Sequence, residues 1–182
     1  MPGPDIRSIV EALRAAEVRY VLTGSVAAAV HGAPVEPRDF DIAPDLAADN
    51  LARLAGVLAD WGAKPIHDPR WPGTLTPEEC EQWTPEPPTP GQLDHLLTTP
   101  VGLFDVVPWR SGWYLDLVVR ALERNVEGIL VKVAHPVDLM ATLKMDQDKH
   151  RARRPYLEER LSLGSPGATE EPPTHRRRAS PQ

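Results

Sequence analysis

The sequence has a single cysteine and no long apolar run, and both shortages exclude classes of protein. Cys80 cannot form an internal disulfide, and its neighbours lack the spacing of a metal site. No apolar stretch approaches the length of a membrane span, and none near residue 1 is typical of a secretion signal. We therefore expect a protein of the reducing cytoplasm without a membrane partner. The formal net charge of −6 argues against coating DNA through charge alone, whereas a local basic patch remains compatible with RNA.

The 182 residues, of which 41% are hydrophobic, are sufficient for one globular domain, which we expect to cover residues 1–163. Nine of the 21 prolines fall within residues 64–100, where short pieces of regular structure are expected only at 77–82 and 92–97. This proline-rich insertion is either a flap that faces the substrate or a solvated loop without function. Residues 164–182 lack significant apolar content and predict a disordered tail.

The order of apolar patterns along the chain predicts an α+β fold. Residues 5–17 have apolar side chains at helical spacing behind a capping aspartate, Asp5, and 18–23 are typical of a short buried strand. The complete prediction has helices at 5–17, 25–30, 48–61, 114–124, 137–151 and 155–163. Strands are predicted at 18–23, 101–107 and 129–134, with another around Asp41 that ends at Pro44. The expected architecture is a small mixed sheet with helices packed on it.

The junction after the first predicted strand is typical of a phosphate site. The apolar run ending at Thr23 leads into Gly24 and Ser25, and a helix of alanine and valine follows. A glycine lets the backbone approach a phosphate closely, and the start of a helix offers N–H groups and partial positive charge. The Ser25 hydroxyl adds a donor. We therefore predict that Gly24 and Ser25 bind the phosphates of a nucleotide.

Two aspartates follow on the next predicted strand. Residues at i and i+2 of a strand point to the same face, so Asp39 and Asp41 project together while Phe40 turns into the core. The repulsion between the two anions is removed by a bound cation, and Mg²⁺ prefers hard oxygen ligands. Asp105 lies within another apolar strand, where a buried carboxylate requires a partner. We predict that these three aspartates form a catalytic site holding two Mg²⁺ ions.

Such a site suits nucleotidyl transfer from a nucleoside triphosphate. A hydroxyl attacks the α-phosphorus in line, pyrophosphate leaves, and two metal ions stabilise the attacking and leaving oxygens. Asp105 could accept the proton of the attacking hydroxyl. Lys144 could reach the β- or γ-phosphate as a point charge, and Arg38, next to Asp39, is a second cationic candidate.

Two stretches of the chain resemble a known superfamily. The run YVLTGSVAAAVHG followed by RDFDI is similar to the signature of the polymerase-beta-like nucleotidyltransferases. The later run HPVDLMATLKMDQDKHRARRPYLEERL resembles the C-terminal segment of minimal bacterial nucleotidyltransferases related to the AbiEii toxin group. The resemblance covers about residues 18–163 without the insertion, and it implies the nucleotidyltransferase fold. It also implies the same site: Gly24 and Ser25 for phosphate, Asp39, Asp41 and Asp105 for Mg²⁺, and Lys144 for the triphosphate.

The acceptor is less well defined by the sequence. Glu36-Pro37-Arg38 stands where the relatives carry Arg-x-Thr, and residues 149–155 replace their Gly-Arg-x-Lys-Asp. The basic run over 144–154 favours an RNA acceptor such as a tRNA 3′ end, although it also fits a solvated helix end. Acidic residues in the insertion would instead suit a cationic small molecule of the aminoglycoside kind. A third alternative is a non-catalytic protein of the same fold that binds a cognate antitoxin.

Overall fold

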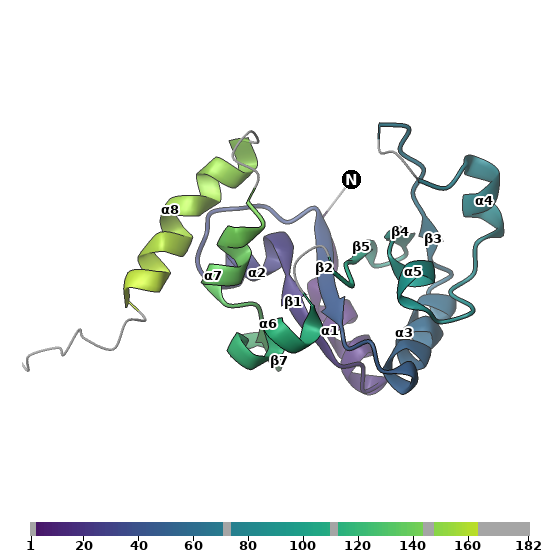
Figure 1. Ribbon diagram of the computed structural model, residues 1–182, viewed down its shortest axis with the longest axis horizontal. Coiled ribbons are helices and arrows are strands. Elements are labelled where there is room, and N and C mark those ends of the chain that lie inside the picture. Colours follow the sequence, from purple (N-terminus) through teal and green to yellow (C-terminus); the bar gives the residue numbers. More distant parts are fainter. Residues whose placement is uncertain (1–2, 71–73, 110–112, 144–147, 164–182) are drawn as a thin grey trace, which may run out of the picture.

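The computed structural model describes residues 3–70, 74–109, 113–143 and 148–163, and it is built on one mixed sheet (Figure 1). Its strands are β1 (Tyr20–Thr23), β2 (Asp39–Pro44), β3 (Lys64–Pro65), β4 (Leu96–Thr99), β5 (Gly102–Val106), β6 (Leu122–Val126) and β7 (Ile129–Val133). Its helices are α1 (Ile6–Ala15), α2 (Gly24–Val30), α3 (Ala48–Asp60), α4 (Pro77–Gln82), α5 (Pro90–Leu93), α6 (Tyr114–Arg120), α7 (Pro136–Ala141) and α8 (Asp148–Leu163).

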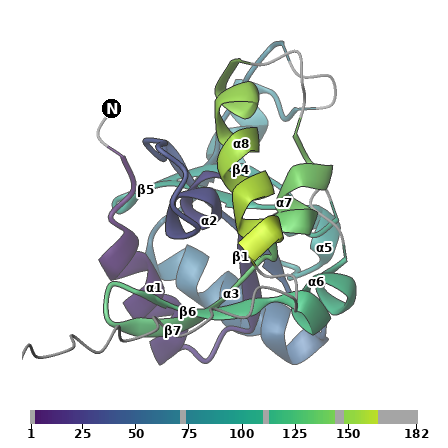
Figure 2. The ribbon, with the colours of Figure 1, turned by 90° about the vertical axis from the view of Figure 1, so that its left-hand side faces the viewer.

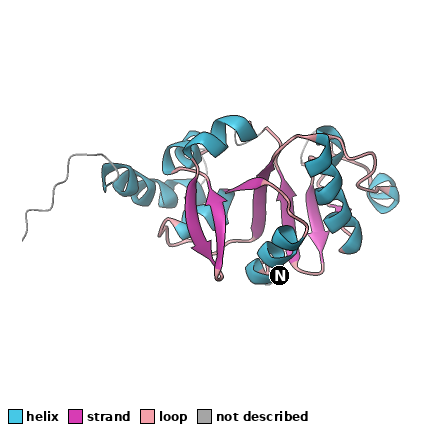
Figure 3. Ribbon diagram, turned by 90° about the horizontal axis from the view of Figure 1, so that it is seen from below, coloured by secondary structure: helices cyan, strands magenta, loops and turns pink. Residues whose placement is uncertain are grey.

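The seven strands are ordered β3-β4-β5-β2-β1-β7-β6. β2 is parallel to β5, β1 is parallel to β7, and the other neighbouring strands are antiparallel. Helices lie on both sides of the sheet (Figure 3). The expected α+β class and mixed sheet are therefore confirmed. No helix within the described ranges is long and apolar enough to cross a membrane.

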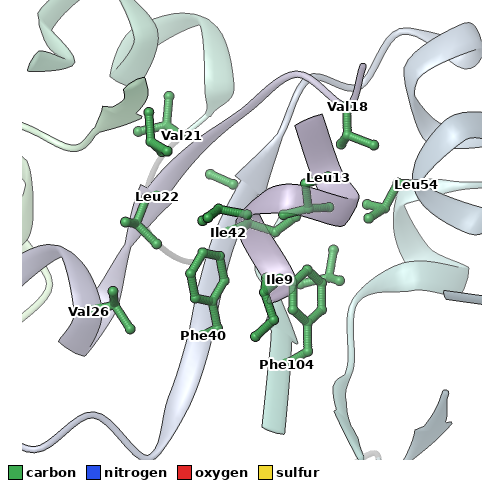
Figure 4. Packing of buried hydrophobic residues seen from close by; sticks show 14 of the residues in the cluster. Ile9, Leu13, Val18, Val21, Leu22, Val26, Phe40, Ile42, Leu54 and Phe104 are labelled. Carbon is green, nitrogen blue, oxygen red and sulfur yellow. The ribbon is translucent and has the colours of Figure 1, made fainter. Parts of the chain in front are cut away.

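The main core lies on the face of the sheet that α1 covers. Figure 4 shows Ile9 of α1 beside Phe40 of β2 and Phe104 of β5. The two phenylalanine rings stack with centroids 6.0 Å apart, and Trp61 packs edge-on against Phe104 at 5.5 Å. Burying a ring of this kind stabilises the fold by about 2–3 kcal/mol. Because side chains alternate along a strand, the burial of Phe40 turns its neighbour Asp41 to the opposite face.

The N-terminal half of the prediction is confirmed closely. The predicted capping residue Asp5 accepts a hydrogen bond from the backbone N–H of Ser8 at 3.1 Å. β1, α2, β2 and α3 also lie within the predicted ranges or one residue beyond them. In this half the apolar spacing and the helix signals are local, so the elements could be predicted from neighbouring residues alone.

The predicted helix at 114–124 is confirmed at 114–120 and wrong at its C-terminal end. α6 ends at Arg120, and residues 122–126 form β6, which pairs with β7 through a tight hairpin. Glu127 and Gly128 both have positive φ, at 52° and 88°, which is the requirement of a two-residue type I′ turn. The side-chain oxygen of Asn125 accepts a 2.8 Å hydrogen bond from the Gly128 N–H. The turn therefore favours strand pairing over continued helix.

The predicted single helix at 137–151 is helical at 137–141 in α7 and at 148–151 in α8, but it is wrong at residues 142–143, because α7 ends at Ala141. Pro136 occupies the first helical turn, as expected. Thr142 stops the helix, and its hydroxyl donates to the Leu139 carbonyl at 2.8 Å. α8 includes the predicted helix 155–163. Figure 2 shows α7 and α8 beside each other.

The proline-rich segment 64–100 is more regular than expected. Its ends form β3 and β4, which extend the sheet, and α4 matches the short piece predicted at 77–82. Lys64 holds the chain after α4 by donating to the carbonyls of Glu81 at 2.7 Å and Trp83 at 2.9 Å. Leu93 and Leu97 are fully buried, so this segment belongs to the core. The predicted tail at 164–182 lies outside the described residues.

Candidate active site

The turn from β1 into α2 brings the backbone against a carboxylate. Gly24 has a φ of +64°, a conformation that L side chains rarely adopt. A Cβ at this position would overlap Oδ2 of Asp41. Position 24 therefore requires glycine for two independent reasons: the backbone conformation and the closeness of the Asp41 carboxylate.

The three predicted aspartates lie on one face of the sheet. Asp39 and Asp41 are two residues apart on β2, and Asp41 pairs with Asp105 in the parallel register of β2 and β5. Register partners in a parallel pair project to the same side. Asp105 is buried, with 9% of its surface exposed. β2 and β5 thus gather carboxylates that are far apart in the sequence.

Ser25 organises two of these carboxylates. Its hydroxyl donates to Oδ1 of Asp39 at 3.2 Å, and its backbone N–H hydrogen-bonds Asp41. Ser25 itself is buried. These hydrogen bonds show Ser25 holding the two aspartates in position. They do not test the prediction that Ser25 binds a nucleotide phosphate.

The environment of Asp41 disfavours its negative charge. Burial raises the pKa of Asp41 to about 7, and the charges of Asp39 and Asp105 act in the same direction. The Ser25 N–H and the charge of Arg153 oppose that rise. Oδ2 of Asp41 is buried and has no hydrogen-bond partner among the described residues. A bound cation would satisfy this oxygen and relieve the repulsion, so the site fits a divalent metal.

The described residues do not supply a complete set of metal ligands by themselves. In the described ranges, no group of three His, Cys, Asp or Glu side chains is arranged so that it could hold a metal ion. Mg²⁺ is commonly held by one or two carboxylates together with substrate phosphates and water. Asp39 and Asp41 therefore fit a metal that arrives with a phosphate-bearing ligand better than a permanently bound one.

A cavity of about 150 Å³ opens beside these aspartates. Its walls come from the β1–α2 turn, β2, the end of α7 and α8, and they are formed by Gly24, Ser25, Ala28, Asp39, Asp41, Leu139, Thr142, Leu143, Arg153 and Leu157. A second hollow of about 330 Å³ shares Ser25, Asp39 and Arg153 with it. The second hollow also includes Arg38, the cation that the sequence placed near the site.

The structure adds Arg153 to the candidate site. From the sequence, this residue belonged to a basic run that suited either an RNA acceptor or a solvated helix end. In the fold it lines both hollows and interacts electrostatically with Asp41 and Asp39. A signal was present in the helical spacing of Arg153, Leu157 and Arg160, which puts the three on one side of α8. Lys144, the predicted triphosphate contact, lies outside the described residues.

Solved structures of similar architecture follow the chain over most of its length. The lincosamide antibiotic adenylyltransferase LnuA, bound to lincomycin, superposes with a TM-score of 0.56 at 15% sequence identity. The superposition covers 85% of this chain and 94% of the LnuA chain. The antibiotic-resistance factor ANT(2'')-Ia superposes with a TM-score of 0.55 at 12% identity, covering 86% and 82%. The fold is that of the nucleotidyltransferases. No family model and no curated protein matches the sequence.

Proposed function

We propose that the protein is a nucleotidyltransferase that moves a nucleoside monophosphate from a nucleoside triphosphate to an acceptor hydroxyl. The observation that carries the proposal is the meeting of Asp39 and Asp41 with the Gly24 turn at one cavity, with Asp105 opposite Asp41 on the same face. Oδ2 of Asp41, which has no hydrogen-bond partner within the described ranges, marks where a cation would bind. The shared fold with nucleotidyltransferases supports this chemistry.

Each residue has a role in the proposed reaction. Asp39 and Asp41 would hold Mg²⁺, with phosphate oxygens of the nucleotide completing its coordination. When bound, the metal would neutralise the negative charge that develops on the phosphate oxygens. Asp105 would accept the proton of the attacking hydroxyl. Gly24 leaves room for the Asp41 carboxylate beside the turn, and Ser25 keeps the Asp39 carboxylate oriented.

The acceptor belongs to one of two classes. A small hydroxyl-bearing compound is supported by the similarity to LnuA, whose structure contains lincomycin, and to an antibiotic-resistance factor. An RNA acceptor is supported by the basic residues of α8. The fold weakens the second case, because Arg153 faces the cavity and Arg154 pairs with Glu158 at 2.6 Å. We therefore favour the small-molecule acceptor.

Transfer of label tests the proposal and the acceptor class together. The protein is incubated with Mg²⁺, each α-³²P-labelled triphosphate, and lincomycin, an aminoglycoside or total RNA. We expect label on a small molecule, loss of transfer in Asp39→Asn, and full transfer in Asp116→Asn, which makes the same change on the exposed surface of α6. Label on RNA would overturn the preferred acceptor. An absence of transfer in every combination would overturn the proposed function.

A further inference from the structure

One side of α8 is fixed against the rest of the fold. Leu157 is fully buried, and one turn later Nε of Arg160 donates to the His31 carbonyl at 2.9 Å. His31 is in turn buried, and its Nε2 lies 2.9 Å from the Ala134 carbonyl oxygen. Arg153 lies one turn before Leu157 on the same side of the helix. The docking of α8 therefore directs Arg153 toward the cavity.

Two charged groups of opposite sign each leave one buried atom without a hydrogen bond. Among the described residues, neither Nε of Arg153 nor Oδ2 of Asp41 has a hydrogen-bond partner, and both side chains line the same cavity. A buried polar atom without a hydrogen bond costs free energy until a ligand satisfies it. A ligand that presents a cation to Asp41 and an anion to Arg153 would satisfy both atoms. A polyphosphate carrying a divalent metal has this combination.

Arg153 also lies at the junction of the two hollows. It lines the cavity beside Asp41 and the neighbouring hollow that includes Arg38. An extended phosphate chain that runs from one hollow into the other would pass its side chain. A guanidinium N–H donated to a phosphate oxygen is a strong, charge-assisted hydrogen bond.

We propose that Arg153 binds the phosphates of the donor nucleotide, opposite the metal that Asp39 and Asp41 would hold. The proposal rests on the proposed function, and it assigns to a residue of α8 the phosphate contact that we predicted from the sequence for Lys144 and Arg38. Arg154, the next residue, provides a matched contrast. Arg154 carries the same charge on the same helix. Unlike Arg153, it is exposed, and its Nε is paired with Oε1 of Glu158.

Calorimetric binding tests this role without requiring turnover. The full chain and the variants Arg153→Ala, Arg153→Lys and Arg154→Ala are titrated with magnesium tripolyphosphate and with a non-hydrolysable magnesium–nucleoside triphosphate. For Arg153→Ala we expect affinity for both ligands to fall about 10- to 100-fold, as for a lost charge-assisted hydrogen bond. Arg153→Lys should recover part of the loss, and Arg154→Ala should stay within about twofold. Thermal unfolding is measured for each variant, and Arg153→Lys serves as the test should the alanine variant fail to fold.

The outcomes separate this inference from the proposed function. Equal affinities for the wild type, Arg153→Ala and Arg154→Ala would overturn the role of Arg153 and leave the donor site intact. A loss confined to the nucleotide, with tripolyphosphate unaffected, would also overturn it, because Arg153 would then contact the base or sugar. A wild type that binds neither ligand would overturn the proposed function itself.

Discussion

Asp41 lies directly opposite Asp105 in the parallel pairing of β2 with β5, so two carboxylates project from the same face of the sheet. Asp39 projects from that face two residues earlier. The mutual repulsion of these carboxylates and the burial of Asp41 both disfavour the negative charge of Asp41. A bound cation would offset the cost, which makes the pair the physical basis of the proposed reaction.

Replacing Asp41 with asparagine should stabilise the protein at alkaline pH. The pKa of Asp41 is raised from 3.8 to about 7, so the folded state keeps a proton that the unfolded chain has lost. Stability therefore falls as pH rises from about 4 to 7, and the penalty is fully present above pH 7. We expect Asp41→Asn to raise the Tm by about 4 °C or more at pH 8 and to leave it nearly unchanged at pH 4.

Thermal unfolding across this pH range provides the measurement. Mg²⁺ added together with tripolyphosphate at pH 8 should raise the Tm of the wild type more than that of Asp41→Asn, because the variant lacks one of the metal ligands. An equal Tm difference between the two proteins at pH 4 and pH 8 would show that the Asp41 charge is not disfavoured by the fold.

Gly24→Ala should disrupt the candidate site, whereas a glycine-to-alanine substitution elsewhere in the chain should be tolerated. The new Cβ would overlap Oδ2 of Asp41 at a φ of +64°, so we expect lower stability and loss of triphosphate binding. Gly56→Ala is the matched control, since a Cβ there meets nothing within 4 Å and α3 gains about 0.5–1 kcal/mol of helix propensity. Calorimetry and thermal unfolding measure both. Unchanged binding in Gly24→Ala would refute the close packing of turn and carboxylate.

Much of the site was predictable from the sequence because its first half is local. The β1–α2–β2 unit follows from apolar spacing, a Gly-Ser junction and two aspartates separated by one residue. The alignment of Asp105 with Asp41 depends on a parallel pairing across more than sixty intervening residues, so only its presence in an apolar strand was readable. The orientation of Arg153 depends on how α8 docks through Leu157 and Arg160, which helical spacing alone does not fix.

Asp105→Asn should separate catalysis from donor binding. Asp105 lies on the same face as Asp41 but is not among the residues that wall the cavity beside Gly24. If it accepts the proton of the acceptor hydroxyl, its loss should lower turnover by about 10²-fold or more. The affinity for a magnesium–triphosphate should change by less than about threefold. Steady-state kinetics and calorimetry measure the two quantities, with Asp116→Asn as the surface control. A fall in affinity as large as the fall in turnover would make Asp105 a donor-site ligand instead.

Arg160→Ala should loosen α8 and weaken donor binding indirectly. The variant removes the 2.9 Å hydrogen bond to the His31 carbonyl, which costs about 1–2 kcal/mol for a charged donor. Amide hydrogen exchange in α8 should become faster, and the affinity for tripolyphosphate should fall less than in Arg153→Ala. Arg154→Ala, whose ion pair is exposed, should leave exchange in α8 nearly unchanged. Exchange as slow in Arg160→Ala as in the wild type would show that this hydrogen bond does not hold α8 in place.

The most direct test of the account is a structure of the protein with Mg²⁺ and a non-hydrolysable nucleoside triphosphate. We expect the metal on Asp39 and Asp41, with the triphosphate in the cavity between the Gly24 turn and Arg153. A nucleotide bound elsewhere on the protein, or a metal that contacts neither Asp39 nor Asp41, would contradict it.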